Sequence, residues 1–247
     1  MATNWARRHV ANFSLDDCTT QQIVDYLSFD RSVRKIAVGV HITTLNSLYR
    51  KDLACSDFDI ADVIYCDGWS MYILGKCAGL KNIQRIATTD LYPKLIEQLN
   101  SPLKIFFLGG DASLGPSLKR NWLQKYPLDS CDFSDGFPKN WSDALEYVVS
   151  KSPNILFLGL GMPLELQILN QYKRFLPNCL IISCGGMLRL LAGVEKRSPK
   201  CIQLLRLEWL YRLSTSPRRT FSRYFIGLIN VFRTIVEIVF SRLVSKK

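Results

Sequence analysis

One aspartate stands where a parallel α/β sheet would place a catalytic acid or base. In VIYCDGWS, residues 63–70, Asp67 follows directly on an apolar run and precedes a glycine. A carboxylate at such a position can point into the crevice at the end of a strand and take a proton from a hydroxyl group. An aspartate of ordinary pKa is ionised at neutral pH and is ready for that role. A turn residue that hydrogen-bonds its own backbone is the alternative, and the residues alone leave both open.

The histidines, acidic pairs and cysteines predict no metal site. Asp57 and Asp59 form an Asp-x-Asp pair, but they precede an apolar run instead of following one, and Asp62 continues the acidic spacing of a solvated helix face. The two histidines, interpreted as a solvated His9 and a structural His41, form no metal motif. The eight cysteines show no metal-ligand spacing and are interpreted as buried free thiols of a reducing compartment. We therefore expect no metal and no other cofactor.

Glycines follow several of the apolar runs. KIFFLGGDASLG, residues 104–115, is similar to a phosphate-binding loop but has neither the GxGxxG spacing nor the Walker lysine. Glycine lets a diphosphate approach backbone N–H groups at the start of a helix, although a tight strand-to-helix turn explains the same residues. We expect four of these glycines to border a substrate: Gly109, Gly110, Gly185 and Gly186.

Positive charge is concentrated near the C-terminus. Residues 196–247 contain twelve Lys or Arg and two Glu, whereas residues 1–195 contain twenty basic and nineteen acidic groups. We therefore expect the C-terminal segment to meet an anionic partner. Arginines mixed with aromatic residues in LEWLYRLSTSPRRTFSRYF, residues 207–225, suit both nucleic acid and an anionic membrane. The segment that follows is too apolar for a solvated nucleic-acid arm, which favours the membrane.

The segment after Phe221 has the pattern of one long, mostly apolar helix. Polar or small residues recur at steps of four and three and form a narrow stripe, called here the polar stripe: Arg223, Gly227, Asn230, Thr234, Glu237 and Ser241. The apolar stretch 224–240 is 17 residues long and is interrupted by Arg233 and Glu237. A spanning helix needs about 20 apolar residues. We favour a helix that lies in the membrane interface, with packing on the domain or spanning as alternatives.

The elements that must position these residues follow a regular order. Apolar runs at 35–40, 61–68, 104–110, 154–161 and 179–186 alternate with segments of helical spacing. This order predicts an α/β fold with a parallel, Rossmann-like sheet that is covered by helices on both faces. Ligands of such sheets gather at the carboxyl ends of the strands. We expect residues 1–195 to form the α/β domain and residues 196–247 to form a basic, amphipathic appendage. The first residues contain no apolar core of a signal peptide, so we expect a cytoplasmic protein.

A series of motifs resembles one known family. In chain order these are ITTLN, ADVIYCDGWS, RIATTDL, FFLGG, YP, DGF, FLGLGMP, GGMLRLLAG, KRSP and LEWLYRLSTSPRR. They look like the motifs of the WecG/TagA/CpsF glycosyltransferases of bacterial surface-polysaccharide assembly. The resemblance covers roughly residues 35–225, and the last two motifs are its most specific part.

The resemblance implies a function and its partners. The expected reaction is a metal-independent, inverting transfer from a UDP-sugar to a polyprenyl-diphosphate-linked saccharide, in exopolysaccharide, capsule, O-antigen or teichoic-acid-type synthesis. The sugar would be of the N-acetylmannosamine, N-acetylmannosaminuronic acid or glucose type. The appendage would bind an anionic membrane surface on the inner face of the cytoplasmic membrane and complete the active site. Nucleic acid is not an expected partner, and a homo-oligomer is compatible with this reading. The alternative is a non-enzymatic module that binds anionic lipid or nucleic acid.

Roles for residues of the α/β domain follow from the same resemblance. Asp67 matches the general base proposed for the family. Thr44 and Asn46 in TLN match its active-site Thr-x-Asn, and Arg85 matches a substrate-binding arginine. Arginines can also offset the charge that builds on a departing UDP, a role otherwise given to a metal ion.

Arg212, Arg218 and Arg219 match arginines of the appendage that close over the diphosphate. The chain departs from the family pattern at two positions that we expect to border the donor. Glu165 stands where a glutamine is usual, and Arg189 stands where an acid is often found.

Overall fold

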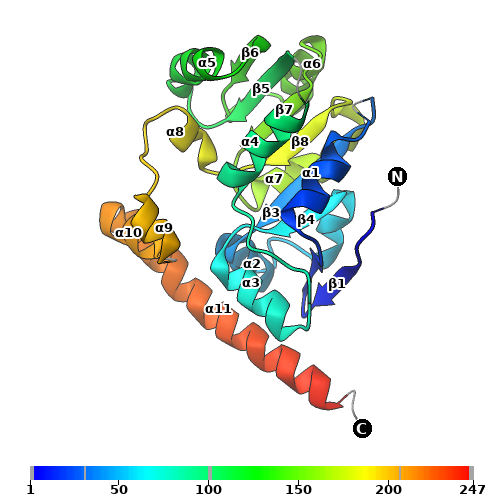
Figure 1. The fold of residues 1–247 in the computed structure, drawn as a ribbon, viewed down its shortest axis with the longest axis vertical. Helices are drawn as coiled ribbons and strands as arrows, with labels where there is room; N and C mark the ends of the chain where they lie inside the picture. The colour runs from blue at the N-terminus through cyan, green and yellow to red at the C-terminus, as the bar shows by residue number, and fades with distance from the viewer. Residues whose placement is uncertain (1–2, 31, 100–101, 206, 245–247) are drawn as a thin grey trace.

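The computed structural model describes residues 3–30, 32–99, 102–205 and 207–244, and its centre is a six-stranded parallel sheet (Figure 1). The strands lie in the order β4-β3-β8-β7-β5-β6. Their bounds are β3 (Lys35–Val40), β4 (Val63–Cys66), β5 (Leu103–Gly109), β6 (Leu128–Ser134), β7 (Ile155–Gly159) and β8 (Leu180–Ser183). Two further strands, β1 (Arg7–Val10) and β2 (Phe13–Asp16), form an antiparallel hairpin.

Helices cover both faces of the sheet, as predicted. Strand residues alternate between two hydrophobic cores, so that Ile36 and Val38 belong to one core while Ala37 belongs to the other. The first core contains residues of α2 (Ile42–Tyr49), α3 (Trp69–Cys77), α6 (Trp141–Ser150) and α7 (Leu164–Gln171). The second contains residues of α1 (Thr20–Ser28), α4 (Thr88–Leu99), α5 (Leu114–Lys125) and α8 (Met187–Leu191). Two short 3₁₀ helices lie at Cys55–Ile60 and Lys173–Phe175. The expected α/β class is confirmed.

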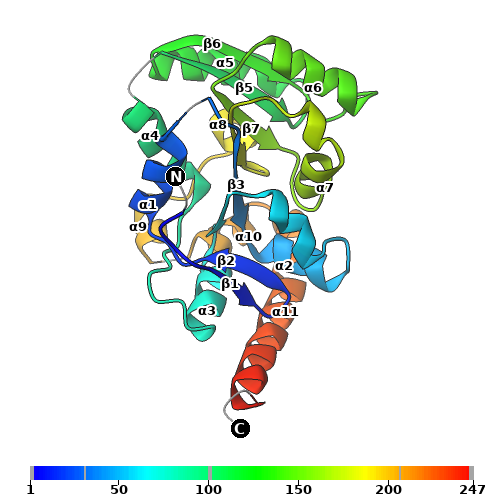
Figure 2. The same ribbon diagram turned by 90° about the vertical axis from the view of Figure 1, so that its right-hand side faces the viewer.

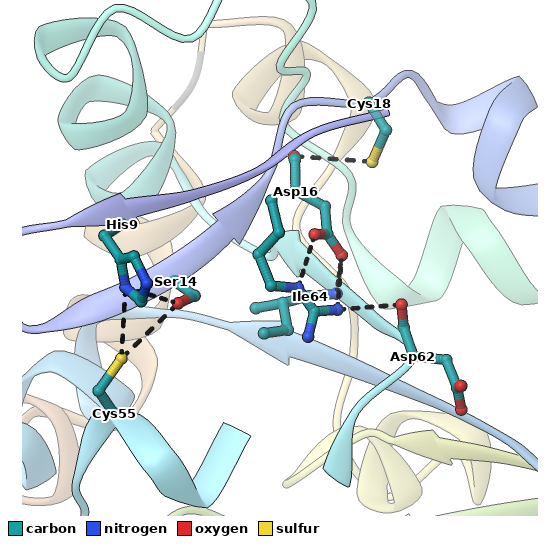
Figure 3. Close-up of polar contacts among 8 residues, drawn as sticks. His9, Ser14, Asp16, Cys18, Cys55, Asp62 and Ile64 are labelled. Atoms are coloured by element: carbon teal, nitrogen blue, oxygen red, sulfur yellow. Dashed lines mark hydrogen bonds and ion pairs between the residues drawn. The ribbon is translucent and has the colours of Figure 1, made fainter. Parts of the chain in front are cut away.

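The hairpin β1–β2 is tied to the edge of the sheet (Figure 3). Arg7 donates to both carboxylate oxygens of Asp16, and Oδ2 of Asp16 also accepts the backbone N–H of Ile64 over 2.7 Å. In the same view, His9 Nδ1 lies 3.2 Å from Ser14 Oγ and 3.7 Å from Cys55 Sγ. His9 therefore has polar partners. All eight cysteines are free, as expected, but only four of them are buried: Cys18, Cys66, Cys131 and Cys179.

The C-terminal helices lie beside this domain. Helices α9 (Lys200–Leu204) and α10 (Glu208–Thr215) lead to α11 (Pro217–Val244), which packs on α2 and α3 (Figures 1 and 2). Edge-to-face contact between Trp209 and Tyr224, with ring centroids 6.3 Å apart, joins α10 to α11. By length and composition Thr220–Val244 could also cross a membrane.

Helix α11 packs the middle of its polar stripe on the domain, whereas Glu237 and Ser241 are exposed. Asn230 and Thr234 are buried, and a Cβ added to Gly227 would lie 2.3 Å from the side chain of Ile42, so only glycine allows this approach. The opposite side of the helix, called here the outer face, is apolar and exposed: Phe221, Phe225, Leu228, Phe232, Phe240 and Leu243. Packing on the domain and exposure of the apolar side therefore occur together. Packing on the domain and binding at the membrane interface, alternatives in the sequence analysis, are therefore compatible.

Candidate functional site

The carboxyl ends of β3 and β4 bring His41 and Asp67 side by side. The last register pair of the two strands is Val40 with Cys66, and the N–H of Asp67 donates to the carbonyl of Val40 over 2.9 Å. His41 and Asp67 are the next residue of each strand. Gly68, whose φ is +147°, turns the chain directly into α3. Two polar residues thus follow adjacent strands at the carboxyl edge of the sheet.

Only one carboxylate oxygen of Asp67 accepts a hydrogen bond from a described residue. The hydroxyl of Thr88 donates to Oδ2 of Asp67 over 3.0 Å, and it lies 2.7 Å from the hydroxyl of Tyr65. Burial raises the pKa of Tyr65 well above its ordinary value, so the phenol stays protonated and can donate to Thr88. No described residue hydrogen-bonds Oδ1. Asp67 is therefore oriented on one side and retains an acceptor for a substrate hydroxyl.

His41 is a residue of the site whose place sequence reasoning missed. Its Nδ1 accepts the N–H of Thr43 over 3.2 Å, so the neutral ring carries its proton on Nε2. Burial lowers the pKa of His41, and the charges of Arg223 and Arg212 lower it further, while nearby Asp67 raises it. The ring is consequently a neutral N–H donor between Asp67 and the appendage. The signal in the sequence was its position at a strand end, one position before α2.

Thr44 and Asn46, predicted to be catalytic, have structural contacts. Oγ1 of Thr44 accepts the N–H of His41 over 3.2 Å and thereby caps α2. The amide of Asn46 donates to the carbonyl of Arg223 over 3.0 Å and accepts from Asn230 over 2.9 Å. Thr44 therefore orients the strand end that carries His41, and Asn46 anchors α11. A direct part of either in chemistry stays a prediction.

Glu165 joins two loops at the carboxyl edge of the sheet. Its Oε1 accepts the N–H groups of Leu160, Gly161 and Gly185 over 3.1, 3.0 and 2.7 Å, and its Oε2 accepts the hydroxyl of Ser183. Burial raises the pKa of Glu165, although these hydrogen bonds oppose the shift. Glu165 is 1% exposed and its acceptors are occupied, so in this state it shapes the edge where a donor would lie.

The predicted glycines lie at the ends of two strands on the same edge, Gly109 and Gly110 at the end of β5 and Gly185 and Gly186 after β8. A Cβ on Gly109 would meet the carbonyl oxygen of Gly159 at 2.3 Å, so glycine is needed there for close packing of β5 and β7. Gly110 follows with φ of +67°. The N–H of Gly185 donates to Glu165, and Gly186 is the N-cap residue directly before α8. Packing and turn geometry thus account for part of this pattern, and contact with a substrate stays a prediction.

Arg189 spans the loops after β5 and β8. Its guanidinium lies 2.7 Å from Glu195 and 3.6 Å from Asp111, which follows Gly110. Its charge is therefore already offset by two carboxylates. A direct contact with the donor stays a prediction.

The arginines come from both parts of the chain. Arg85 lies beside Cys66 through a backbone bridge, and its guanidinium pairs with Glu208 of α10. Arg212 is exposed on α10 and acts electrostatically on His41, and Arg218 is exposed in the first turn of α11. The side chain of Arg219 lies outside the described part of the structure. The appendage therefore places positive charge beside the strand ends that carry Asp67.

The acidic pair Asp57/Asp59 is not part of this site. It lies in the 3₁₀ helix Cys55–Ile60, and Oδ2 of Asp57 accepts the N–H of Ala54 over 2.7 Å. Within residues 3–30, 32–99, 102–205 and 207–244, no group of three or more His, Cys, Asp or Glu side chains is placed to hold a metal.

A carboxylate and several arginines gathered at the carboxyl ends of parallel strands are typical of enzymes that act on phosphate-bearing substrates. The model of the glycosyl transferase WecG/TagA/CpsF family matches residues 8–245. The chain therefore belongs to the WecG/TagA/CpsF family of glycosyltransferases, which confirms the family and the enzyme class inferred from the motifs.

Two curated relatives agree with this assignment. Both are named N-acetylglucosaminyldiphosphoundecaprenol N-acetyl-beta-D-mannosaminyltransferase. The protein of Bacillus spizizenii is 27% identical over 161 residues, which is 64% of this chain and 63% of that protein. The protein of Bacillus subtilis is 27% identical over 204 residues, which is 79% of this chain and 78% of that protein.

Proposed function

We propose that this chain transfers one sugar from a UDP-sugar to a polyprenyl-diphosphate-linked saccharide with inversion and without a metal ion. The observation that carries the proposal is the one-sided hold on Asp67, which leaves a carboxylate oxygen available beside His41 and the arginines. The names of the two relatives favour an N-acetylmannosamine donor and an N-acetylglucosaminyl-diphosphoundecaprenol acceptor. N-acetylmannosaminuronic acid and glucose are the other donors that we propose to test.

The proposed reaction is a single displacement. Asp67 takes the proton of the acceptor hydroxyl while the oxygen of that hydroxyl attacks C1 of the donor sugar. The bond from C1 to the diphosphate oxygen breaks at the same time. Attack from the side opposite the leaving group inverts the anomeric centre. Negative charge grows on the departing UDP, and Arg85, Arg212 and Arg218 are proposed to offset it. Arg219 has the same proposed role, and its side chain lies outside the described part of the structure. The neutral Nε2–H of His41 can hold a substrate oxygen without competing for the proton.

The outer face of α11 supports action at a membrane. Phe221, Phe232 and Phe240 are 62%, 69% and 68% exposed. Burial of one such side chain in an apolar phase is worth about 2 kcal/mol, so several together favour adsorption at the interface. Basic residues of the appendage would add attraction to anionic lipid. We therefore propose that α11 lies on the inner face of the cytoplasmic membrane with the middle of its polar stripe on the domain.

A donor panel tests the proposed reaction. The full chain is incubated with UDP-N-acetylmannosamine, UDP-N-acetylmannosaminuronic acid or UDP-glucose and a synthetic N-acetylglucosaminyl-diphosphate lipid, and the lipid is read by mass spectrometry. We expect the mass of one sugar residue to be added with one donor in clear preference. A matched incubation without protein is the control. An unchanged acceptor with every donor would contradict the proposal.

A further inference from the structure

The backbone of Arg85 is held next to Cys66, the residue before Asp67. Its backbone forms an isolated bridge with Cys66, and the N–H of the following Ile86 donates to the carbonyl of Cys66 over 2.8 Å. The guanidinium carbon lies 5.6 Å from the ring centre of Trp69, which starts α3 two residues after Asp67. Arg85 therefore belongs to the same strand end as the proposed base.

The carboxylate that faces Arg85 comes from the appendage. Glu208, the first residue of α10, accepts from a terminal nitrogen of Arg85 across a separation of 123 residues in the chain. The side chains of Arg85 and Glu208 are only 19% and 15% exposed. A carboxylate and a guanidinium that are mostly removed from water attract each other more strongly than an exposed pair does, and removal of either one leaves a poorly solvated charge without its partner.

Glu208 is itself held by a second arginine. Its Oε1 lies 3.7 Å from Nε of Arg197, and Arg197 donates to both carboxylate oxygens of Asp90 over 2.6 and 2.9 Å. Asp90 lies in the first turn of α4, two residues after Thr88, which holds Asp67. Charges of alternating sign thus form a chain of contacts from α4 to the end of β4: Asp90, Arg197, Glu208 and Arg85.

Glu208 accepts from only one nitrogen of Arg85, so other N–H groups of the guanidinium remain for a substrate. A guanidinium has five N–H donors, and Glu208 accepts from one nitrogen, while Nε of Arg85 is buried and has no hydrogen-bond partner among the described residues. A carboxylate that takes one side of a guanidinium fixes the direction of the other donors. Without this carboxylate, a mostly buried cation would have lost its counter-charge and would reorient.

We propose that Glu208 is a positioning residue, which orients Arg85 toward the substrate and so makes the docked α10 a condition for a competent site. The proposal rests on the proposed function, because it assigns Arg85 to the binding of a phosphate-bearing substrate. This role differs from that of a contact that only holds the appendage on the domain. Loss of such a contact would lower the stability of the docked appendage, whereas loss of a positioning residue changes substrate binding through Arg85.

A double-mutant cycle separates these two roles. KM and kcat for donor and acceptor are measured for wild type, Arg85→Ala, Glu208→Gln and the double variant, with a soluble acceptor analogue so that membrane binding does not contribute. We expect Glu208→Gln to raise KM for the substrate that Arg85→Ala impairs, by on the order of tenfold to a hundredfold, the worth of one charge-assisted hydrogen bond. The double variant should be no worse than Arg85→Ala alone.

The matched control is Glu237→Gln. Glu237 accepts from the hydroxyl of Tyr49 over 3.1 Å and is another contact of the appendage with the domain, with no contact to Arg85. The Glu237→Gln protein should have KM values for donor and acceptor within about twofold of wild type, as is usual for a surface substitution. If Glu208→Gln does not fold, Glu208→Asp keeps the charge, withdraws it by one methylene and enters the same cycle.

The outcomes are distinct. Losses that add in the double variant, or a Glu208→Gln protein within about twofold of wild type while Arg85→Ala is impaired, would overturn the positioning role. An Arg85→Ala protein with unchanged KM would overturn it as well. A wild-type protein that transfers no sugar from any donor would instead reject the proposed function.

Discussion

The side-chain amide of Asn230 donates to Oδ1 of Asn46 over 2.9 Å and joins two residues that are 184 positions apart in the chain. The same Asn46 donates to the carbonyl of Arg223, and Thr234 lies 2.9 Å from the hydroxyl of Tyr49. These contacts fix the rotation of α11 about its axis. The middle of the polar stripe is therefore packed on the domain together with Ile238, while the apolar outer face is exposed.

The outer face of α11 should control membrane binding. We expect the double substitution Phe232→Ser and Phe240→Ser to reduce pelleting with anionic vesicles strongly, because it removes two exposed aromatic side chains worth about 2 kcal/mol each on burial. Phe137→Ser is the matched control, since Phe137 is 79% exposed but lies outside the appendage. The melting temperature should stay close to wild type in both. Unchanged pelleting of the double variant would argue against the outer face as the membrane contact.

The contact of Gly227 with Ile42 should be essential for docking of α11. A Cβ at position 227 would lie 2.3 Å from two atoms of Ile42, so Gly227→Leu should push the helix away from α2. We expect faster tryptic cleavage within residues 217–244 and lower transfer to a soluble acceptor. Leu228→Ala, one residue further on the exposed side, serves as the control and should behave like wild type. Cleavage at the wild-type rate in Gly227→Leu would mean that this contact does not hold the helix.

The fold and part of the site were predictable from local sequence. Five apolar runs gave five of the six strands of the sheet, because buried parallel strands are continuous apolar segments. Strand β6 was missed because it lies at the edge and its sequence LDSCDFS is half polar. The hairpin β1–β2 was missed because its four-residue strands depend on Arg7 and Asp16, whose pairing no local pattern predicts.

The parts of the site that the sequence does not predict depend on contacts between residues far apart in the chain. The ion pair of Arg85 with Glu208 joins residues 123 positions apart, and neither residue stands in a motif that predicts the other. The polar stripe of α11 was visible, but an amphipathic pattern does not say whether water, lipid or protein covers each side. The sequence does not place His41 beside Asp67, because their closeness depends on the register of β3 with β4.

Glu165 should make stability depend on pH. Burial raises its pKa in the folded state above the ordinary value of 4.5. The folded protein then binds a proton more readily than the unfolded chain, so the contribution of Glu165 is greatest below pH 4.5 and is lost as pH rises through the raised pKa. A glutamine has no such proton, and its oxygen can still accept from the backbone N–H groups. We expect the free energy of unfolding of wild type, relative to Glu165→Gln, to fall as the pH rises above 4.5 in urea titrations. A difference that does not change with pH would contradict the assigned shift.

Transfer should not need a divalent ion. We propose that arginines offset the charge of the leaving UDP, so an excess of EDTA should leave the rate of transfer essentially unchanged. A known metal-dependent glycosyltransferase, assayed in the same buffer, shows that chelation is complete. Loss of activity that Mn²⁺ or Mg²⁺ restores would instead assign a metal site and would remove the need for the arginines in this role.

Replacement of Asp67 by asparagine tests the central claim most directly. Asparagine keeps the size of the side chain and can still accept from Thr88, but it cannot take the proton of the acceptor hydroxyl. The turnover number and the dissociation constant for UDP are measured on the same protein, the second by calorimetry. The account predicts a fall in turnover of about 10²–10⁴-fold, the usual worth of a placed general base, with unchanged affinity for UDP. Turnover within about threefold of wild type would contradict it, because a base of that worth cannot be removed at so small a cost.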